Sequence, residues 1–201
     1  MNMGFNKFLI MPPAYYKYDD IDVINFYSKI TNELTESKII LYNFEKLSGY
    51  KFSIECVEKL VDQFPDQIIG VKDSSYNLYE DLKINNFSIL PGSETKLLKG
   101  LNLGCSGIIT ATCNVTANIS RKVFDEFFSK NESNYNELLC NIREEFDNYN
   151  LISALHSYFS VKDKMYENVI PPLKLLSIDD KKKIINNLEK LNFSINNLMV
   201  A

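Results

Sequence analysis

The chain has 201 residues, of which 45% are hydrophobic and 24% are charged, as in an ordinary soluble domain. Its net charge of -4 argues against a nucleic-acid partner, because binding to phosphates requires clustered lysine and arginine side chains. The four cysteines lack C-x-x-C spacing and occur with a single histidine, so we expect a reducing compartment and no metal site.

The first predicted element is a strand over 7–11, which ends at Pro12 and Pro13. Its apolar run, from Phe8 to Met11, is too short for a signal-peptide core or a membrane span. Since no other stretch reaches membrane length, we expect a cytoplasmic protein without a membrane partner.

Amphipathic segments and short apolar runs then alternate along the chain. Ser53 is a predicted N-cap, the charged run in 178–193 is expected to be a solvated helix face, and His156 is expected to be structural. The predicted helices are 19–37, 53–64, 77–85, 94–104, 118–130, 134–159 and 178–193. The further predicted strands are 38–44, 66–75, 86–94 and 105–112.

Strand–helix repeats with continuous apolar strands are typical of a parallel sheet that is buried on both faces. Five strands fit an open doubly wound sheet, and they also fit part of an eight-stranded barrel. Composition does not distinguish the two architectures. In both of them, functional residues lie at the carboxyl ends of the strands.

Lys72 stands at such an end, directly after the apolar run 68–71. Apolar surroundings favour the neutral amine of a lysine, which can attack a carbonyl and form a Schiff base, and tyrosine hydroxyls can move the protons. Alternatively, Lys72 pairs with Asp73 or extends to solvent. The polar residues at predicted strand ends are Tyr15, Tyr16, Tyr42, Asn43, Lys72, Asp73, Ser93, Glu94, Thr110 and Thr112.

Five motifs occur in the order and spacing of one known family. They are "PPAYYK" (12–17), "ILYNF" (40–44) with "LSG" (47–49), "IIGVKDSS" (68–75), "LPGSE" (90–94) and "GCSGIITATCNV" (104–115). On these motifs the chain resembles the dihydrodipicolinate synthase / N-acetylneuraminate lyase family from about residue 8 to the C-terminal helices. The resemblance implies an α/β fold of the (β/α)8 TIM-barrel kind. It also implies a class I aldolase acting on pyruvate or another 2-oxo acid, with no metal and no cofactor.

The resemblance also implies a role for each matching residue. Lys72 matches the Schiff-base lysine, and Tyr42 matches the tyrosine that relays protons. Tyr15 matches a tyrosine that crosses the subunit interface in many members, with Tyr16 as the alternative, so a homodimer or homotetramer is implied. The implied substrate-binding positions are Leu47, Gly92, Ser93 and Ile109.

The chain departs from the family in length. The family's barrel has eight strands, and this sequence supplies what resemble the last five. We therefore expect an incomplete TIM barrel over 1–117, with strands equivalent to the fourth to eighth, and a C-terminal helical extension over 118–201. The absent part would hold the Gly-Thr/Ser-rich segment that binds the pyruvate carboxylate, so we expect the isolated chain to be inactive. Three explanations fit this shorter length: the chain is a fragment, it is a truncated gene product, or another polypeptide completes it.

Leu47 bears on the substrate. Dihydrodipicolinate synthases carry an arginine there, which holds the carboxylate of the aldehyde substrate. The apolar residue at this position resembles that of the 2-keto-3-deoxy sugar-acid aldolases, although these usually have proline where this chain has Glu45. The implied function is therefore a lyase or aldolase of a 2-keto-3-deoxy sugar acid. The alternatives are a 4-hydroxy-tetrahydrodipicolinate synthase-type condensation and an inactive, truncated barrel that serves only as an assembly partner.

Overall fold

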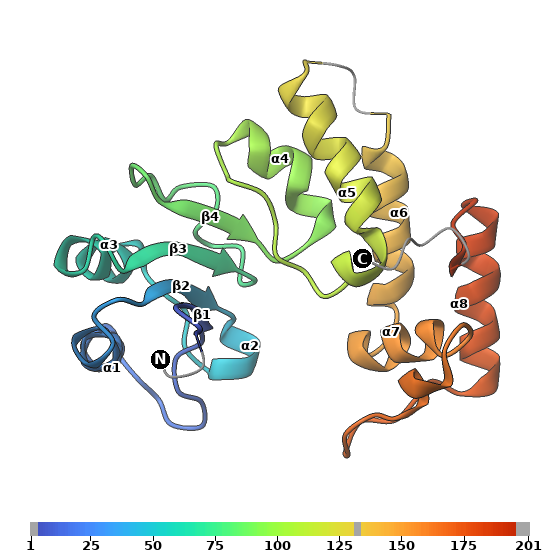
Figure 1. The fold of residues 1–201 in the computed structure, drawn as a ribbon, viewed down its shortest axis with the longest axis horizontal. Helices are drawn as coiled ribbons and strands as arrows, with labels where there is room; N and C mark the ends of the chain where they lie inside the picture. The colour runs from blue at the N-terminus through green and yellow to red at the C-terminus, as the bar shows by residue number, and fades with distance from the viewer. Residues whose placement is uncertain (1–3, 131–133, 196–201) are drawn as a thin grey trace. The chain divides into compact units, whose positions relative to one another are not determined.

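A computed structural model describes residues 4–130 and 134–195 of the chain (Figure 1). The chain divides into two compact units, each with its own hydrophobic core. The first unit comprises residues 1–92 and 99–109, and the second comprises residues 93–98 and 110–201. The predicted division into a partial barrel over 1–117 and a helical extension stays a prediction.

The first unit is built on a parallel sheet, as the strand–helix pattern predicts. Its four strands lie in the order β1-β2-β3-β4, so chain order and spatial order agree. The strands are β1 (Lys7–Ile10), β2 (Lys38–Asn43), β3 (Ile68–Asp73) and β4 (Ser88–Pro91).

The register of β2 and β3 determines which side chains share a face of the sheet. Tyr42 pairs with Lys72, and Asn43 pairs with Asp73. Because successive side chains of a strand point to opposite faces, Tyr42 and Lys72 lie on one face while Asn43 and Asp73 lie on the other. The second of these faces is buried against helices, whereas the first is only half-buried at both of its residues.

Two helices of the first unit cover the buried face (Figure 1). α1 (Asp20–Glu33) begins with a capping box between Asp19 and Asp22, and α3 (Ile54–Gln63) begins at the predicted N-cap Ser53, whose hydroxyl accepts the amide of Cys56. The Tyr27 hydroxyl of α1 donates to the Ile10 carbonyl of β1 at 2.7 Å. The short helices are α2 (Glu45–Ser48), the 3-10 helix η1 (Glu94–Lys96) and α4 (Leu97–Asn102).

The helix predicted over 77–85 is wrong. This segment forms a single turn, in which the Leu82 amide donates to the Leu78 carbonyl at 2.8 Å. The carboxylate of Asp73 accepts the backbone amides of Leu78 and Tyr79 where this turn begins. The helical spacing still marked the buried side correctly, since Leu78 and Leu82 are both in the core.

The strand predicted over 105–112 is not formed as a regular strand. The amide of Ser106 donates to the Ile89 carbonyl, and that of Ile109 donates to the Pro91 carbonyl, so the segment runs beside β4. The two donors are three residues apart rather than two, because Gly107 between them adopts a φ of 143°. This backbone irregularity interrupts the ladder that an alternating strand would make.

The second unit contains η1 and the helices not yet named. These helices are α5 (Cys113–Phe128), α6 (Asn136–Asp147), α7 (Leu151–Phe159), the 3-10 helix η2 (Lys164–Glu167) and α8 (Ile178–Lys190). The single helix predicted over 134–159 is wrong, since the structure divides it into α6 and α7. Asn150 caps α7 by accepting the amide of Ser153 at 3.1 Å, so a new helix begins there.

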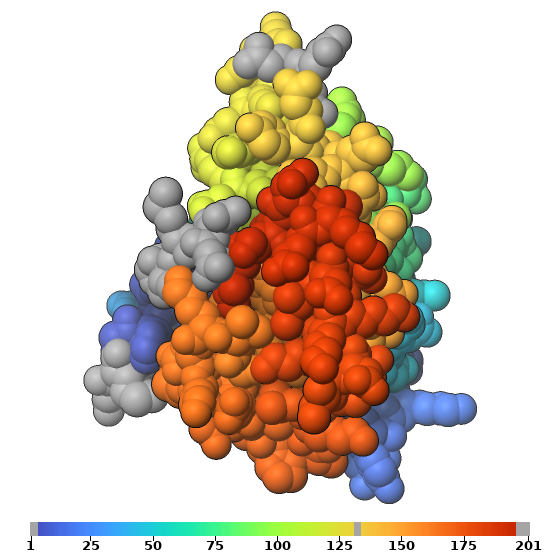
Figure 2. All heavy atoms as spheres, turned by 90° about the vertical axis from the view of Figure 1, so that its right-hand side faces the viewer, coloured from blue at the N-terminus to red at the C-terminus, as the bar shows by residue number. Residues whose placement is uncertain are grey.

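The predicted solvated face of the last helix is confirmed. Ile184 and Leu188 of α8 are buried in the core of the second unit. Most charged residues of this helix are exposed, although Asp180 and Lys181 are half-buried, and Figure 2 shows the helix at the surface in red. Across residues 4–130 and 134–195, no helix has the length and apolar character needed to cross a membrane.

Candidate active site

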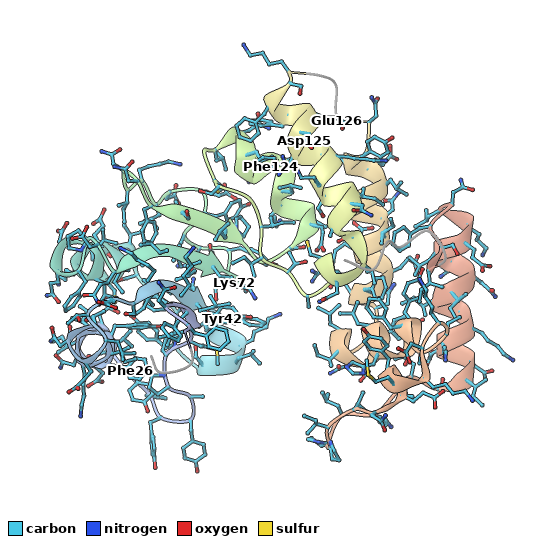
Figure 3. The ribbon with its side chains drawn as sticks, in the orientation of Figure 1. Phe26, Tyr42, Lys72, Phe124, Asp125 and Glu126 are labelled. Carbon is cyan, nitrogen blue, oxygen red and sulfur yellow. The ribbon has the colours of Figure 1, made fainter. Side chains whose placement is uncertain are left out.

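Lys72 and Tyr42 form the centre of the candidate site. They come from the carboxyl ends of the neighbouring strands β3 and β2, and Figure 3 shows them close together. The ammonium nitrogen Nζ of Lys72 lies 4.0 Å from the centroid of the Tyr42 ring. This is a cation–π contact, and it holds the amine over the aromatic face rather than free in solvent.

The alternative in which Lys72 pairs with Asp73 does not fit the geometry. Asp73 is fully buried, and its carboxylate already accepts four N–H donors, from Asn43 and from three backbone amides. Its side chain also points to the opposite face of the sheet from Lys72. The amine of Lys72 is therefore left on the half-buried face with Tyr42.

The structure does not bring Tyr15 to this pair. Tyr15 and Tyr16 are 91% and 69% exposed, and their rings meet each other edge-on at 5.0 Å. Tyr15 also has a φ of 87°, an uncommon conformation for a tyrosine. Among the described residues, neither ring forms a ring–ring contact with Tyr42 or a cation–π contact with Lys72. The role implied for Tyr15 stays a prediction.

Two of the predicted substrate-binding positions lie where neighbouring strands end. The Gly92 amide donates to the Asp73 carbonyl at 2.9 Å, and a Cβ atom on Gly92 would lie 2.2 Å from the Ser74 Oγ and 3.1 Å from its Cα. Glycine is therefore required for the ends of β3 and β4 to approach. Ile109 is half-buried beside Pro91, to which its amide donates at 3.2 Å.

The other two predicted positions differ in exposure. Leu47 lies on α2 and is 57% exposed, so its side chain presents apolar surface. Ser93 belongs to the second unit, is buried, and caps η1 by accepting the amide of Thr95. Each position is thus described, and its role in binding stays a prediction.

Glu94 organises a buried polar network in the second unit. Its side chain is fully buried, and its Oε2 accepts from Arg143 Nη1 and from the Thr112 hydroxyl, each at 2.9 Å. Its Oε1 accepts from the hydroxyls of Thr110 at 2.6 Å and Thr116 at 2.9 Å. This carboxylate therefore ties η1 to α5 and α6.

Sequence reasoning marked Glu94 only as a strand-end residue and missed this network. Arg143 is 49 positions away from Glu94, and no local signal connects them. The only hint in the sequence was the group of three threonines at 110, 112 and 116, whose hydroxyls are natural donors to a carboxylate.

The network determines the charge state of Glu94. Burial alone would raise the pKa of its carboxyl group, but hydrogen bonds from Thr110 and Thr112 and the charge of Arg143 outweigh burial. The pKa of Glu94 is therefore lowered from its ordinary value of 4.5.

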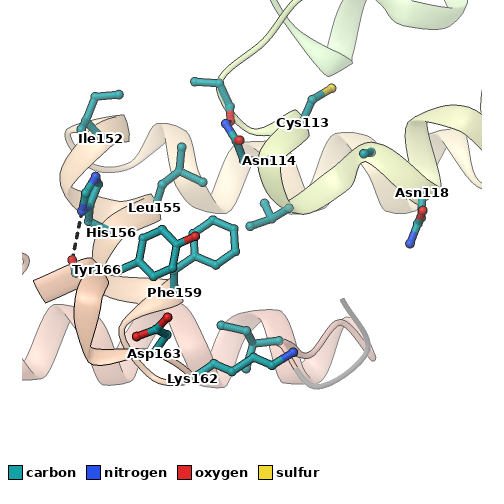
Figure 4. Close-up of a pocket in the computed structure, with 14 residues that line it drawn as sticks. Cys113, Asn114, Asn118, Ile152, Leu155, His156, Phe159, Lys162, Asp163 and Tyr166 are labelled. Carbon is teal, nitrogen blue, oxygen red and sulfur yellow. Dashed lines mark hydrogen bonds between the residues drawn. The ribbon is translucent and has the colours of Figure 1, made fainter. Parts of the chain in front are cut away.

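A separate cavity of about 760 Å³ lies within the second unit, between α5, α7 and η2 (Figure 4). His156 lines it, and its Nδ1 lies 3.0 Å from the Tyr166 carbonyl oxygen, so this ring nitrogen carries the proton it donates. Burial raises the pKa of the Cys113 thiol, another lining group, which makes it a poor nucleophile. None of the predicted site residues lines this cavity.

No metal centre stands out among the described side chains. Within residues 4–130 and 134–195, no three His, Cys, Asp or Glu residues are grouped as ligands of one ion.

A parallel α/β sheet with a lysine and a tyrosine at the carboxyl ends of adjacent strands is typical of the class of α/β proteins whose functional sites lie at that edge of the sheet. The chain belongs to the dihydrodipicolinate synthetase family, whose family model matches residues 1–191. The family resemblance seen in the five motifs is thus confirmed.

Two curated relatives show the range of the family. The chain is 24% identical over 188 residues to a 2-dehydro-3-deoxy-D-gluconate/2-dehydro-3-deoxy-phosphogluconate aldolase of Picrophilus torridus, covering 89% of this chain and 69% of the relative. It is 30% identical over 128 residues to an N-acetylneuraminate lyase of Clostridium perfringens, covering 62% of this chain and 43% of that enzyme. The family thus comprises aldolases and lyases.

Solved structures show the fold. A pyruvate complex of an Escherichia coli K12 prophage protein of the dihydrodipicolinic acid synthase family matches with a TM-score of 0.80 at 22% identity. The match covers 96% of this chain and 68% of that protein. A dihydrodipicolinate synthase from Cyanidioschyzon merolae with lysine bound gives a TM-score of 0.86 at 16% identity, over 96% and 67% of the two chains. The described fold is therefore that of this TIM-barrel family, and the chain spans about two thirds of the length of these structures.

The Glu94 network generates a prediction about pH. Glu94→Gln should lower the free energy of unfolding at pH 7 by about 3 kcal/mol, because it breaks a buried charged pair. Since the folded pKa of Glu94 lies below its unfolded value, the part of this stabilisation that depends on the charge is present above pH 4.5 and decreases as the pH falls towards the folded pKa. Urea unfolding of both proteins between pH 3 and pH 7 should show a smaller difference at the acid end than at pH 7.

The control is Glu45→Gln, which removes an exposed pair with Lys51 at 3.6 Å. It should change stability by less than about 0.5 kcal/mol. A stability difference for Glu94→Gln that stays constant down to pH 3 would contradict the role assigned to the carboxylate.

Proposed function

We propose that this protein is a class I aldolase of 2-oxo acids in which Lys72 forms an imine with pyruvate. The observation that carries the proposal is the position of the Lys72 amine, 4.0 Å over the Tyr42 ring at the carboxyl ends of two parallel strands. Family membership supports it, because the matched relatives are aldolases and lyases.

The proposed reaction begins at the amine. Lys72 Nζ forms a bond to the carbonyl carbon of a 2-oxo acid, and the carbonyl oxygen leaves as water with the two amine hydrogens, which yields the imine. One proton taken from solvent then gives the protonated imine. The imine then accepts the electron pair of the C3–C4 bond as that bond breaks, while the C4 hydroxyl loses its proton and becomes an aldehyde. Protonation of the resulting enamine at C3 and hydrolysis release pyruvate and restore the amine.

Tyr42 is the proposed proton carrier. Its ring lies under the Lys72 amine, so its hydroxyl belongs to the same face of the sheet and can serve the C4 hydroxyl of the substrate. Tyr15 would complete the relay from a neighbouring copy in a homo-oligomer. Its 91% exposed ring supports this role, because such a side chain is accessible to a partner.

Additional strands would complete the site. The half-buried face that carries Tyr42 and Lys72 also carries Leu9, which is 43% exposed, and Ile40. In a closed barrel this face would be the interior, filled by layers of side chains. We therefore propose that additional strands close the barrel and bind the pyruvate carboxylate. These strands would come from further sequence of this protein or from a second polypeptide. The rival proposal is an inactive barrel fragment that acts only in assembly.

A 2-keto-3-deoxy sugar acid is the proposed substrate. Leu47 supports this choice, since an exposed apolar side chain cannot hold a substrate carboxylate as an arginine does. The similarity to a 2-dehydro-3-deoxy-gluconate aldolase supports it as well. The alternative is condensation of pyruvate with aspartate semialdehyde, as in 4-hydroxy-tetrahydrodipicolinate synthases.

Imine formation is the first test. Protein purified from its own cells, so that any completing polypeptide is retained, should acquire a stable adduct at Lys72 when treated with pyruvate and borohydride. Lys72→Arg should acquire none, because a guanidinium does not form the imine. Peptide mass spectrometry locates the adduct, and an adduct on another lysine, or none, would contradict the proposal.

The role of Tyr42 is tested by removing its hydroxyl. Tyr42→Phe keeps the ring under Lys72 and should leave thermal stability unchanged, yet it should lower kcat by about a hundredfold, the contribution of a proton carrier. Aldol cleavage measured in parallel with thermal unfolding separates the two effects. Near-full activity would make Tyr42 a packing residue.

The substrate proposal is tested by comparing kcat/KM for cleavage of a 2-keto-3-deoxy sugar acid with that for condensation of pyruvate and aspartate semialdehyde. We expect cleavage to be preferred, and Leu47→Arg to raise the condensation constant by introducing a charged partner for the semialdehyde carboxylate. Leu47→Met is the matched apolar control. A preference of the unaltered protein for the semialdehyde would favour the alternative.

A further inference from the structure

A buried polar network lies on the face of the sheet opposite the candidate site. It is centred on Asn43 and Asp73, the residues that directly follow Tyr42 and Lys72, and both are fully buried. Their side chains meet across β2 and β3, where Asn43 Nδ2 donates to Asp73 Oδ1 at 2.8 Å. The two strand ends that carry the candidate site are therefore joined from behind.

Each oxygen of the Asp73 carboxylate accepts two hydrogen bonds. Oδ1 also accepts the backbone amide of Tyr76 at 2.9 Å, and Oδ2 accepts those of Leu78 at 2.9 Å and Tyr79 at 3.0 Å. Because Asp73 is rigidly held in this way, the backbone that links it to Lys72 is held as well. A buried network with all partners present is stiff, since any displacement leaves a polar group unpaired.

Asn43 extends the network to the loop after α2. Its second Nδ2 hydrogen goes to Asn77 Oδ1 at 2.8 Å, and its Oδ1 accepts the backbone amide of Phe52 at 3.2 Å. Asn77 in turn donates to the Phe52 carbonyl at 2.9 Å. The Ser74 amide donates to the Asn43 carbonyl at 2.8 Å, which gives the strand ends a second link. Both site-bearing strands thus end in one network.

We infer that Asn43 and Asp73 are positioning residues, which hold the Lys72 amine over Tyr42 in the orientation that attacks the 2-oxo acid. The inference rests on the proposed imine chemistry. Neither side chain reaches the substrate, because both point away from the face that bears Lys72 and Tyr42. They act by aligning the Lys72 amine with the carbonyl carbon that it attacks. Small errors in this alignment slow the reaction strongly.

The chemistry of the network requires a carboxylate at position 73. Each Asp73 oxygen faces two N–H donors, so an amide in either orientation would direct its own N–H group at two donors. Asp73→Asn therefore keeps the volume of the side chain but disrupts the bonding. Asn43→Ser is the milder variant, since it removes the link between the strands and leaves Asp73 its three backbone donors.

The test measures imine formation as a function of pyruvate concentration, by borohydride trapping in protein purified from its own cells. Both variants should lower the maximal rate of adduct formation at Lys72 at least tenfold. The pyruvate concentration that gives half the maximal rate should change less than twofold, because the network does not contact the substrate. Ile68→Val is the matched control, since it alters the buried opposite end of β3 and should leave both constants unchanged.

Hydrogen exchange of the Tyr76, Leu78 and Tyr79 amides reports on the network itself. Asp73→Asn should accelerate their exchange, while Ile68→Val should not. If Asp73→Asn does not fold, Asn43→Ser alone decides the question.

The outcomes separate the inference from the function it rests on. An adduct in the unaltered protein together with unchanged maximal rates in folded variants would overturn the inference and leave the proposed function standing. An equal loss of rate in Ile68→Val would also overturn it, since the effect would then be one of general stability. Absence of an adduct in the unaltered protein would refute the proposed function, and the inference with it.

Discussion

The parallel register between β2 and β3 is the constraint on which the candidate site depends. It pairs Tyr42 with Lys72 and Asn43 with Asp73, so the two candidate site residues lie next to two buried polar residues along the strands. The alternation of side chains then places one pair on the half-buried face and the other in the interior. A slip of one residue would exchange the two faces and bury the amine. The buried bond between Asn43 and Asp73 opposes that slip directly.

A second buried carboxylate, that of Glu94, links separate segments of the second unit by hydrogen bonds. Glu94 follows Ser93 directly and receives hydrogen bonds from three threonines and Arg143. Both Asp73 and Glu94 are fully buried, yet they are stabilised differently. Asp73 is surrounded by neutral N–H donors, whereas Glu94 has a cationic partner. In each case the charge is kept inside because every oxygen is bonded, which is the condition under which a buried charge is tolerated. Asp73 is the last residue of β3 and Glu94 is the first residue of η1.

Local patterns predicted the elements well where the signal was continuous. The apolar runs located β1, β2 and β3, and Ser53 located the start of α3. Prediction failed over 77–85, which forms a single turn and not a helix. It failed again at Asn150, which begins a new helix inside the segment predicted as one. Gly107 interrupted the expected fifth strand through its backbone conformation. Lys72 and Tyr42 were predicted as candidate site residues from their strand ends and from motif spacing, and this role stays a prediction. The contacts of Glu94 were not predicted, because they join residues 16 to 49 positions apart.

The sequence by itself determined the apolar strands, the family and the residues that stand at the strand ends, because each of these is written in a short, contiguous stretch. Only the tertiary structure decided that the amine of Lys72 lies over the Tyr42 ring rather than beside Asp73. That choice follows from pairing between strands about 30 residues apart, and therefore from a register that no single stretch contains. The partners of Asn43, Asp73 and Glu94 were likewise decided by folding, since buried polar groups find their donors in space and not along the chain.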